Sequence, residues 1–250
     1  MIRGTARRLA LRIARSSFGF RALASVAQAD PQLVVEALGP RVNGSARLSR
    51  VRAWPDTLLG FEDLAFLFSS HQLHHAVISM AIDEAAYLFA LARSLPRATL
   101  AEIGRSKGGS TMLLAVASDG ASHVWSYDLH VKPTSGEKSD AELLSALDRY
   151  DLADRVTLVV GDSRIAEPPP QPCDLVLIDG DHSYEGARAD YERWRGFTRP
   201  GGHILFHDAV ELGELSVAHE GVARLISEIG RDPRLVSRGG TGTLAHFQLR

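Results

Sequence analysis

The sequence predicts an α/β protein with a doubly wound, mostly parallel sheet and a helical extension at its N-terminus. From Pro96 onward, short apolar runs alternate with helical patterns, which is typical of parallel strands joined by helices. Two of these runs, DLVLID and GGHILFHD, end in polar groups at Asp179 and at the pair His207 and Asp208. A buried strand that breaks directly into acids and histidines places them at the carboxyl edge of the sheet, where open α/β sheets bind ligands.

The length and composition fit a soluble enzyme of one domain. The 250 residues are 45% hydrophobic, enough to bury a full core, and a formal net charge of -2 argues against a nucleic-acid partner. The lone Cys173 excludes an intramolecular disulfide and a cysteine-based zinc cluster, and it suits a reducing compartment. No apolar run reaches the roughly 18 residues needed to span a bilayer. We therefore expect a cytoplasmic protein, and a homo-oligomer.

The first 30 residues are strongly basic. They carry six arginines against one acid, with apolar residues between them, and this pattern predicts a basic amphipathic helix. A membrane-surface anchor, a transit peptide and a twin-arginine signal ending near ALASVAQA all remain open, although arginines interrupt the apolar stretch that a signal needs. A helical arm packed on the domain or on a partner subunit is the interpretation we favour.

Residues 56 to 95 predict two helices ahead of the sheet. FEDLAFLF comes first, and a longer segment follows in which apolar residues recur at three- and four-residue steps: Val77, Met80, Ala81, Ala85, Leu88 and Leu91. Pro96 ends the second helix. We divide the chain into a helical arm and cap, residues 1–95, and a sheet domain, residues 96–250. Five aromatic residues could line an acceptor pocket, but most are expected in the core: Trp54, Phe61, Phe66, Phe68 and Tyr87.

The sheet domain contains six predicted strands with helices between them. We place the strands near residues 98–103, 123–127, 156–160, 174–178, 203–206 and 243–249.

A glycine-rich turn follows the first strand in EIGRSKGGS. Gly104, Gly108 and Gly109 allow a tight turn whose backbone can approach a ligand, and the following helix offers unpaired N–H groups to an anion. The turn is not a GxGxxG dinucleotide fingerprint. Asp128 ends the second strand, where an acid can accept both hydroxyls of a ribose, and Asp162 ends the third, where it could face an adenine edge. These strand ends predict a cleft shaped for a nucleoside.

With these motifs the chain resembles the class I S-adenosylmethionine-dependent methyltransferases, a Rossmann-like fold, over about residues 98–210. EIGRSKGGS resembles their first motif, and GDS resembles their adenine motif. Within the class, the spacing of IDGDHSYEG and GGHILFHD is most similar to the metal-dependent O-methyltransferases of the catechol and macrolide-sugar types. These families have an acid at the Asp179 position and two adjacent metal ligands at the His207 and Asp208 positions.

The resemblance assigns roles to individual residues. It implies Glu102 and Gly104 as structural members of the cofactor loop, with Gly108 at its turn, Ser106 and Ser110 as partners of the methionine carboxylate, and Asp128 as the ribose acid. Asp162 and Ser163 would border the adenine. A divalent cation, magnesium or manganese, would be held by Asp179, His207 and Asp208, with Asp179 also beside the cofactor. His182 falls where some sugar enzymes have a histidine base, so it is implied as the general base, acting with Asp179.

The chemistry is consistent with this assignment. A hydroxyl oxygen that attacks a methyl group in line needs positioning and stabilisation of the forming alkoxide, which a cation held by carboxylates supplies. His207 departs from the magnesium pattern, because imidazole suits manganese, iron or zinc better. Either the metal is softer, or His207 lies behind the ligands, or no metal binds and a histidine alone moves the proton.

Each motif also has a purely structural interpretation. Asp179, Gly180 and Asp181 could form a polar turn, and His182 could cap the next helix. His130 fits a solvated loop. His71, His74 and His75 fit a helix cap or a substrate-facing surface better than a metal site. The polar segment VKPTSGEKSD, with Lys132, Glu137 and Lys138, could form a lid over the cofactor edge.

These observations favour an S-adenosylmethionine-dependent O-methyltransferase, assisted by a divalent cation, that acts on a hydroxyl of a saccharide or glycosylated small molecule. The alternatives are a metal-independent methyltransferase acting on a phenolic or other nucleophile, and a nucleoside-binding protein without turnover. An NAD-dependent enzyme is disfavoured by the GRSKGGS loop.

Overall fold

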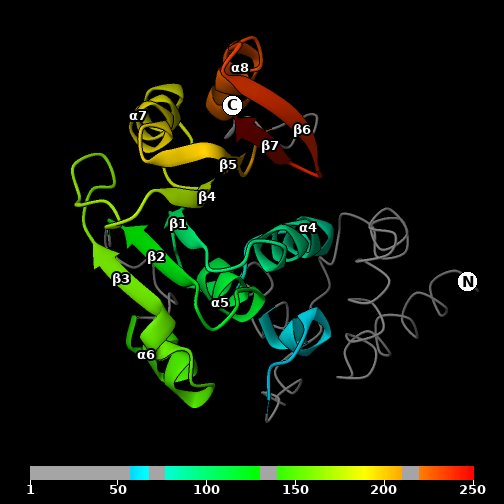
Figure 1. Ribbon diagram of the computed structural model, residues 1–250, viewed down its shortest axis with the longest axis vertical. Coiled ribbons are helices and arrows are strands. Elements are labelled where there is room, and N and C mark those ends of the chain that lie inside the picture. Colours follow the sequence, from blue (N-terminus) through cyan, green and yellow to red (C-terminus); the bar gives the residue numbers. More distant parts are fainter. Residues whose placement is uncertain (1–56, 68–76, 130–139, 210–219) are drawn as a thin grey trace, which may run out of the picture.

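The computed structural model describes residues 57–67, 77–129, 140–209 and 220–250, and it contains a seven-stranded sheet (Figure 1). The strands lie in the order β3-β2-β1-β4-β5-β7-β6. The first five are parallel, and β7 is antiparallel to both of its neighbours. Their bounds are Thr99–Ile103 for β1, His123–Asp128 for β2, Val156–Val160 for β3, Cys173–Ile178 for β4, Thr198–Phe206 for β5, Leu235–Thr241 for β6 and Leu244–Leu249 for β7.

Helices cover both faces of the sheet, which confirms the predicted doubly wound fold (Figure 1). The α-helices are α4 (Ile82–Arg93), α5 (Gly109–Ala117), α6 (Asp140–Arg149), α7 (Tyr184–Arg195) and α8 (Glu220–Ile229), and the 3₁₀ helices are η1 (Phe61–Leu67) and η2 (Ala153–Arg155). Alternate strand residues point to opposite faces, so Leu175 and Leu177 pack with η1, α4, α5 and α6, while Val176 and Ile178 pack with α7 and α8. Two apolar cores therefore hold the sheet from either side.

The strand β6 is absent from the sequence prediction, and β5 begins earlier than predicted. The LVSRGGT segment of β6 has no apolar alternation, is mostly exposed, and contains Gly239 and Gly240 with positive φ values of 85° and 151° at a register shift. A twisted edge strand of this kind pairs through its backbone alone, so its side chains carry little strand signal.

The helical predictions before the sheet need correction. The segment FEDLAFL forms the 3₁₀ helix η1, and the second helix begins only at Ile82, because residues 77–81 are non-helical. The start of α4 is fixed by the Glu84 carboxylate, which accepts a hydrogen bond from the Ala81 N–H at 2.8 Å. Phe61 lies in the core as expected, at 1% exposure.

Several predictions concern residues outside the described ranges. These are the basic helix of residues 1–30, Trp54, Phe68, His71, His74, His75, His130 and the lid segment with Lys132, Glu137 and Lys138. The side chain of Phe66 is likewise not described. The division of the chain at residue 95 stays a prediction. Across the described ranges, none of the helices combines the length and the apolar character that a membrane crossing requires.

Candidate active site

A cavity of about 660 Å³ opens at the carboxyl edge of the sheet. It is lined by the residues that follow β1, β2, β3, β4 and β5. The strand order reverses between β1 and β4, where the connections pass to opposite sides, and such a switch point leaves a crevice. The cavity therefore lies where the sequence placed a ligand site.

The glycine-rich turn forms one wall of this cavity. Gly104 has a φ of 89°, and a β-carbon there would lie 2.0 Å from the Asp179 carbonyl oxygen, so only glycine allows the strand ends to meet. Gly108, with a φ of 81°, is the N-cap of α5 and packs against Leu143 rather than lining the cavity. Ser106 and Ser110 do line it, close to the N-terminus of α5.

Asp128 supports the turn from the neighbouring strand. Its Oδ2 atom accepts hydrogen bonds from the N–H groups of Arg105 at 2.9 Å and Ser106 at 2.8 Å. This contact helps hold Ser106 at a φ of 46°, which is unusual for a residue with a β-carbon. The acid implied as the ribose partner thus also fixes the shape of the loop.

Arg105 is a residue that the sequence prediction missed. Its guanidinium has no exposed surface and pairs with Asp140 at the start of α6, with Nε–Oδ1 at 2.9 Å and Nη2–Oδ2 at 3.0 Å. It also donates to the Ser126 carbonyl oxygen at 2.7 Å. This forked pair ties the glycine-rich turn to β2 and α6. An arginine inside the GRSKGGS turn was the available signal, but nothing in the sequence indicates that it is buried.

Glu102, expected as a structural member of the cofactor loop, is not among the cavity-lining residues. It is fully buried behind the turn, where Oε2 accepts from Thr111 Oγ1 and Ser126 Oγ, both at 2.5 Å. Burial raises the pKa of this carboxyl although neighbouring hydroxyl groups oppose the shift. Its role is to support the turn, in line with the structural part of the prediction.

The two residues predicted to border an adenine line the cavity with other partners. Asp162 forms a forked pair with Arg164, Nη2–Oδ2 at 2.7 Å, and the hydrogen bonds from Arg164 lower the pKa of the Asp162 carboxyl. Ser163 Oγ donates to Asp190 Oδ1 at 2.5 Å. Arg164 and Asp190 thus belong to the cavity wall as well.

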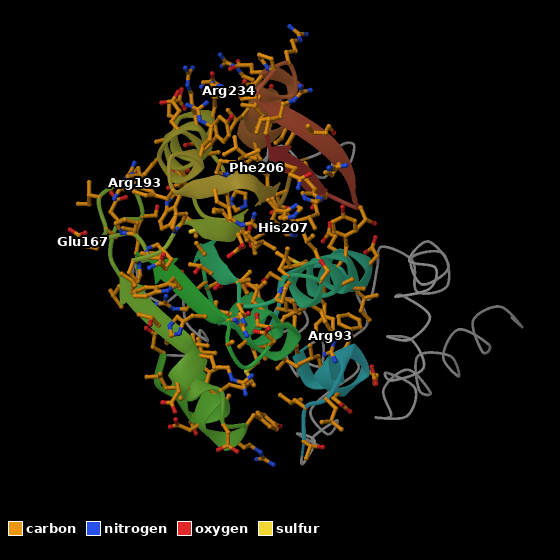
Figure 2. All side chains as sticks on the ribbon, in the orientation of Figure 1. Arg93, Glu167, Arg193, Phe206, His207 and Arg234 are labelled. Atoms are coloured by element: carbon orange, nitrogen blue, oxygen red, sulfur yellow. The ribbon has the colours of Figure 1, made fainter. Side chains whose placement is uncertain are left out.

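The acids and histidines after β4 and β5 form one cluster. His182 Nε2 lies 3.5 Å from Asp179 Oδ1 and 3.2 Å from Asp208 Oδ2. His207, which directly follows β5 (Figure 2), has Nδ1 at 3.1 Å from Asp179 Oδ1 and 3.4 Å from Asp208 Oδ2. The structure thus brings together all four residues that the sequence singled out.

The atoms that could hold a cation come from Asp179, His182 and Asp208, all within 4.8 Å of one another. The predicted ligand set had His207 in place of His182. The His207 side chain is only 6% exposed, and its second nitrogen, Nε2, faces Glu84 Oε2 at 3.2 Å. Both histidines line the cavity, and Nδ1 of His207 lies about as close to the two aspartates as Nε2 of His182, so the ligand set with His207 stays a prediction.

The charges of this cluster stabilise one another. Hydrogen bonds to Asp179 and Asp208 raise the pKa of His182 to about 9, although burial opposes the shift. For His207, burial disfavours the charged ring, but its carboxylate partners outweigh that effect and raise its pKa. Burial opposes ionisation of Asp179 too, yet the two histidines lower its pKa. Without a bound cation, both imidazoles are therefore protonated at neutral pH.

Two further features of the cluster escaped the sequence prediction. Asp208 has a φ of 52°, so its backbone holds the carboxylate in a conformation that few non-glycine residues adopt. Glu84 comes from α4 and meets His207 across 123 positions of the chain. No signal in the sequence marked it, because the helix start at Ile82 that makes Glu84 a capping residue was itself predicted too early.

Comparison with solved structures identifies the fold. A cofactor-bound protein from MTB, Rv0187, is 25% identical with a TM-score of 0.55, and the match covers 69% of this chain and 82% of that one. An O-methyltransferase from Bacillus cereus in complex with SAH is 21% identical with a TM-score of 0.56, covering 91% and 100%. TomG, an O-methyltransferase of tomaymycin synthesis from Streptomyces achromogenes in complex with SAM, is 22% identical with a TM-score of 0.50, covering 70% and 81%.

A family model described as a methyltransferase domain matches residues 101–209, the segment that carries the glycine-rich turn and the acid–histidine cluster. Sequence family and fold agree on the class. Residues 101–209 thus match a methyltransferase domain, and the fold is that of solved O-methyltransferases, which agrees with the class that the sequence resemblance implied.

Proposed function

We propose that this methyltransferase transfers the methyl group of S-adenosylmethionine to a hydroxyl oxygen of a saccharide or glycosylated small molecule, with a divalent cation at Asp179, His182 and Asp208. The observation that carries the proposal is that this cluster and the glycine-rich turn line the same cavity. A methyl donor on the turn and a polar acceptor on the cluster would then share one space, as an in-line transfer requires.

The cofactor end of the cavity suits S-adenosylmethionine. The N-terminus of α5, with Ser106 and Ser110 beside it, offers N–H and hydroxyl donors to a carboxylate. Asp128 ends β2, where a ribose acid is expected. Structural relatives from Bacillus cereus and Streptomyces achromogenes bind SAH and SAM, which supports the same ligand here.

The donor set of the cluster fits a divalent cation. Two carboxylates and one imidazole, partly exposed to the cavity, match manganese, iron or zinc better than magnesium. When bound, such an ion supplies Lewis-acid stabilisation of a forming alkoxide and a template for neighbouring hydroxyls.

His182 is a candidate for two exclusive roles, ligand of the cation or general base that removes the proton. The imidazole is 30% exposed on the cavity side of Asp179 and Asp208, within reach of an acceptor hydroxyl. A protonated ring cannot accept a proton, so this role requires that the negative charge of the two aspartates be neutralised. If His182 is instead a ligand of the cation, the proton leaves to water. The variant His182→Gln separates the two roles: it should lose turnover alone if His182 is the base, and cation affinity as well if His182 is a ligand.

A hydroxylated acceptor agrees with the polar wall beside the cluster. Asp181 and His182 line that wall, and Tyr127 is the one aromatic residue among the described lining residues. Few flat apolar surfaces are therefore available to hold a phenolic ring. Homo-oligomer formation and a cytoplasmic location stay predictions.

The test combines titration calorimetry with an assay of methyl transfer. The full chain is titrated with S-adenosylhomocysteine and with manganese, and radiolabelled S-adenosylmethionine is then offered with a panel of saccharides and phenols. Asp208→Asn should abolish turnover and lower manganese affinity, while S-adenosylhomocysteine still binds. Loss of a residue behind a metal ligand costs roughly 10–100-fold in affinity, so loss of a ligand should cost at least as much. Asp148→Asn is the control, an exposed acid on α6 that belongs neither to the described cavity lining nor to the cluster.

Each contrary outcome selects another function. Full activity in chelator would show a metal-independent methyltransferase. Cofactor binding without transfer to any acceptor would show a silent nucleoside-binding protein. No binding of S-adenosylhomocysteine under any condition would overturn the proposal.

A further inference from the structure

The Glu84 side chain is held in one position beside the cluster, although the residue lies outside the segment 101–209 that matches the methyltransferase family model. It is 4% exposed, and its two oxygens have different partners. Oε2 accepts from the Ala81 N–H at 2.8 Å, and Oε1 accepts from the Thr243 N–H at 2.5 Å and the Thr243 hydroxyl at 2.8 Å. Three donors from the start of α4 and from the turn between β6 and β7 therefore hold this carboxylate in place.

His207 connects Glu84 to the two aspartates. Its Nε2 faces Glu84 Oε2 at 3.2 Å, while Nδ1 faces Asp179 Oδ1 at 3.1 Å and Asp208 Oδ2 at 3.4 Å. Ionised carboxylates only accept hydrogen bonds, so the ring donates at both nitrogens. The imidazole is thus held at both ends, between α4 and the sheet edge (Figure 2).

Both histidines contact the same two aspartate oxygens. His207, which is 6% exposed, and His182, which is 30% exposed, each lie near Asp179 Oδ1 and Asp208 Oδ2 and line the cavity. Two carboxylates this close repel each other unless a positive group lies between them. The position of His207 therefore sets how the aspartates face the cavity.

The turn between β6 and β7 is shaped to receive Glu84. Gly242 has a φ of 56°, and a β-carbon there would lie 2.4 Å from Glu84 Oε1. Any side chain at this position would push the carboxylate away from Thr243. Thr243 also donates to Asp208 Oδ1 at 3.4 Å, so the turn touches both ends of the network.

We propose that Glu84 is a positioning residue of the methyl-transfer site, which acts through His207 to orient Asp179 and Asp208 toward a bound cation and the acceptor hydroxyl. The proposal rests on the proposed function of that site. Residues behind a metal ligand orient it, and their loss costs roughly 10–100-fold in metal affinity or activity.

The test compares Glu84→Gln with Asp83→Asn. Glutamine keeps one oxygen for the two Thr243 donors, but it puts an amide nitrogen where Oε2 accepts from Ala81 and faces His207, and it carries no negative charge. Asp83 is the matched control: it is also buried at the start of α4 and accepts from Thr241 Oγ1, at the end of β6, at 3.1 Å, and none of its described contacts reaches His207 or the aspartates. Gly242→Ala is the second variant, since it displaces the Glu84 carboxylate without changing an ionisable residue.

Four readouts separate positioning from folding: the unfolding temperature, the affinity for S-adenosylhomocysteine, the affinity for manganese, and kcat. In Glu84→Gln and Gly242→Ala, manganese affinity and kcat should fall at least about tenfold, with S-adenosylhomocysteine affinity unchanged within about twofold. Asp83→Asn should lower neither. Equal losses in Glu84→Gln and Asp83→Asn, or wild-type manganese affinity and kcat in Glu84→Gln, would overturn the positioning role.

A further measurement keeps this test separate from that of the function. If the wild-type chain binds neither manganese nor an acceptor, the proposed function fails, and the ¹⁵N resonances of the His207 ring still report on positioning. A change of these resonances in Glu84→Gln and Gly242→Ala, absent in Asp83→Asn, supports the role. Wild-type resonances in both variants refute it.

Discussion

Replacement of Gly104 by alanine should disturb both the fold and the site. The β-carbon would lie 2.0 Å from the Asp179 carbonyl oxygen, while ordinary contacts begin at 3.4 Å, so the end of β4 would have to retreat by about 1.4 Å. The positive φ of 89° adds strain of about 1–2 kcal/mol, and overpacking against backbone adds about 1–3 kcal/mol or more. We expect a total loss of about 2–5 kcal/mol in the free energy of unfolding, or roughly 4–20 °C in Tm.

The control for this prediction is Gly239→Ala. Gly239 has nearly the same φ, 85°, but a β-carbon there would meet nothing within 4 Å. It should therefore lose only the strain of about 1–2 kcal/mol. Guanidinium unfolding followed by circular dichroism measures both variants. An equal loss in the two would refute the close approach of Gly104 to Asp179 and, with it, the argument that this glycine lets the cofactor turn meet the cluster.

Three further predictions concern residues away from the cluster. Burial lowers the pKa of His246 to about 4, below the roughly 6.5 of an unfolded chain. Between these two pKa values the imidazole binds a proton in the unfolded state but not in the folded state. The free energy of unfolding should therefore fall by about 2 kcal/mol from pH 7 to pH 4, and by less in His246→Gln. An unfolding free energy that does not change with pH would contradict this. Burial, with help from the Asp174 charge, raises the pKa of Cys173 to about 12. An aromatic disulfide reagent at pH 8 should therefore react with this thiol only after the chain is unfolded. Fast reaction with the folded chain would refute the prediction. Asp140→Asn removes the counter-charge of the buried Arg105 and should lower the free energy of unfolding by about 2 kcal/mol. The loss is smaller than for a fully buried ion pair because Asp140 is 23% exposed. An unchanged Tm would contradict this.

The sequence predicted the sheet and its polar edge because both depend on local patterns. Apolar runs of strand length, separated by helical segments, identified five parallel strands and β7. Polar residues directly after a strand must lie at its carboxyl end, so Asp128, Asp179 and His207 were placed at one edge without knowledge of the strand order. The β6 strand escaped because it pairs through its backbone and has no side-chain alternation.

The helix start at Ile82 shows where local patterns mislead. Val77 and Met80 continue the helical spacing of α4, but they lie in an extended segment that crosses α5. A β-carbon on Gly109 would lie 2.5 Å from the backbone of Ile78, so this close crossing requires glycine there. Burial of apolar residues satisfies either conformation, and tertiary packing selects the extended one.

By itself, the sequence determined the fold class and which residues gather at the sheet edge. Only the tertiary structure decided how they are arranged: His182 and His207 both contact Asp179 and Asp208, His207 is buried against Glu84, and Glu102 is buried next to the turn. The physical reason is that strand order and chain direction follow from local periodicity, whereas the orientation of a side chain depends on partners far away in the chain. Glu84 reaches His207 across 123 positions, and no local pattern carries that contact.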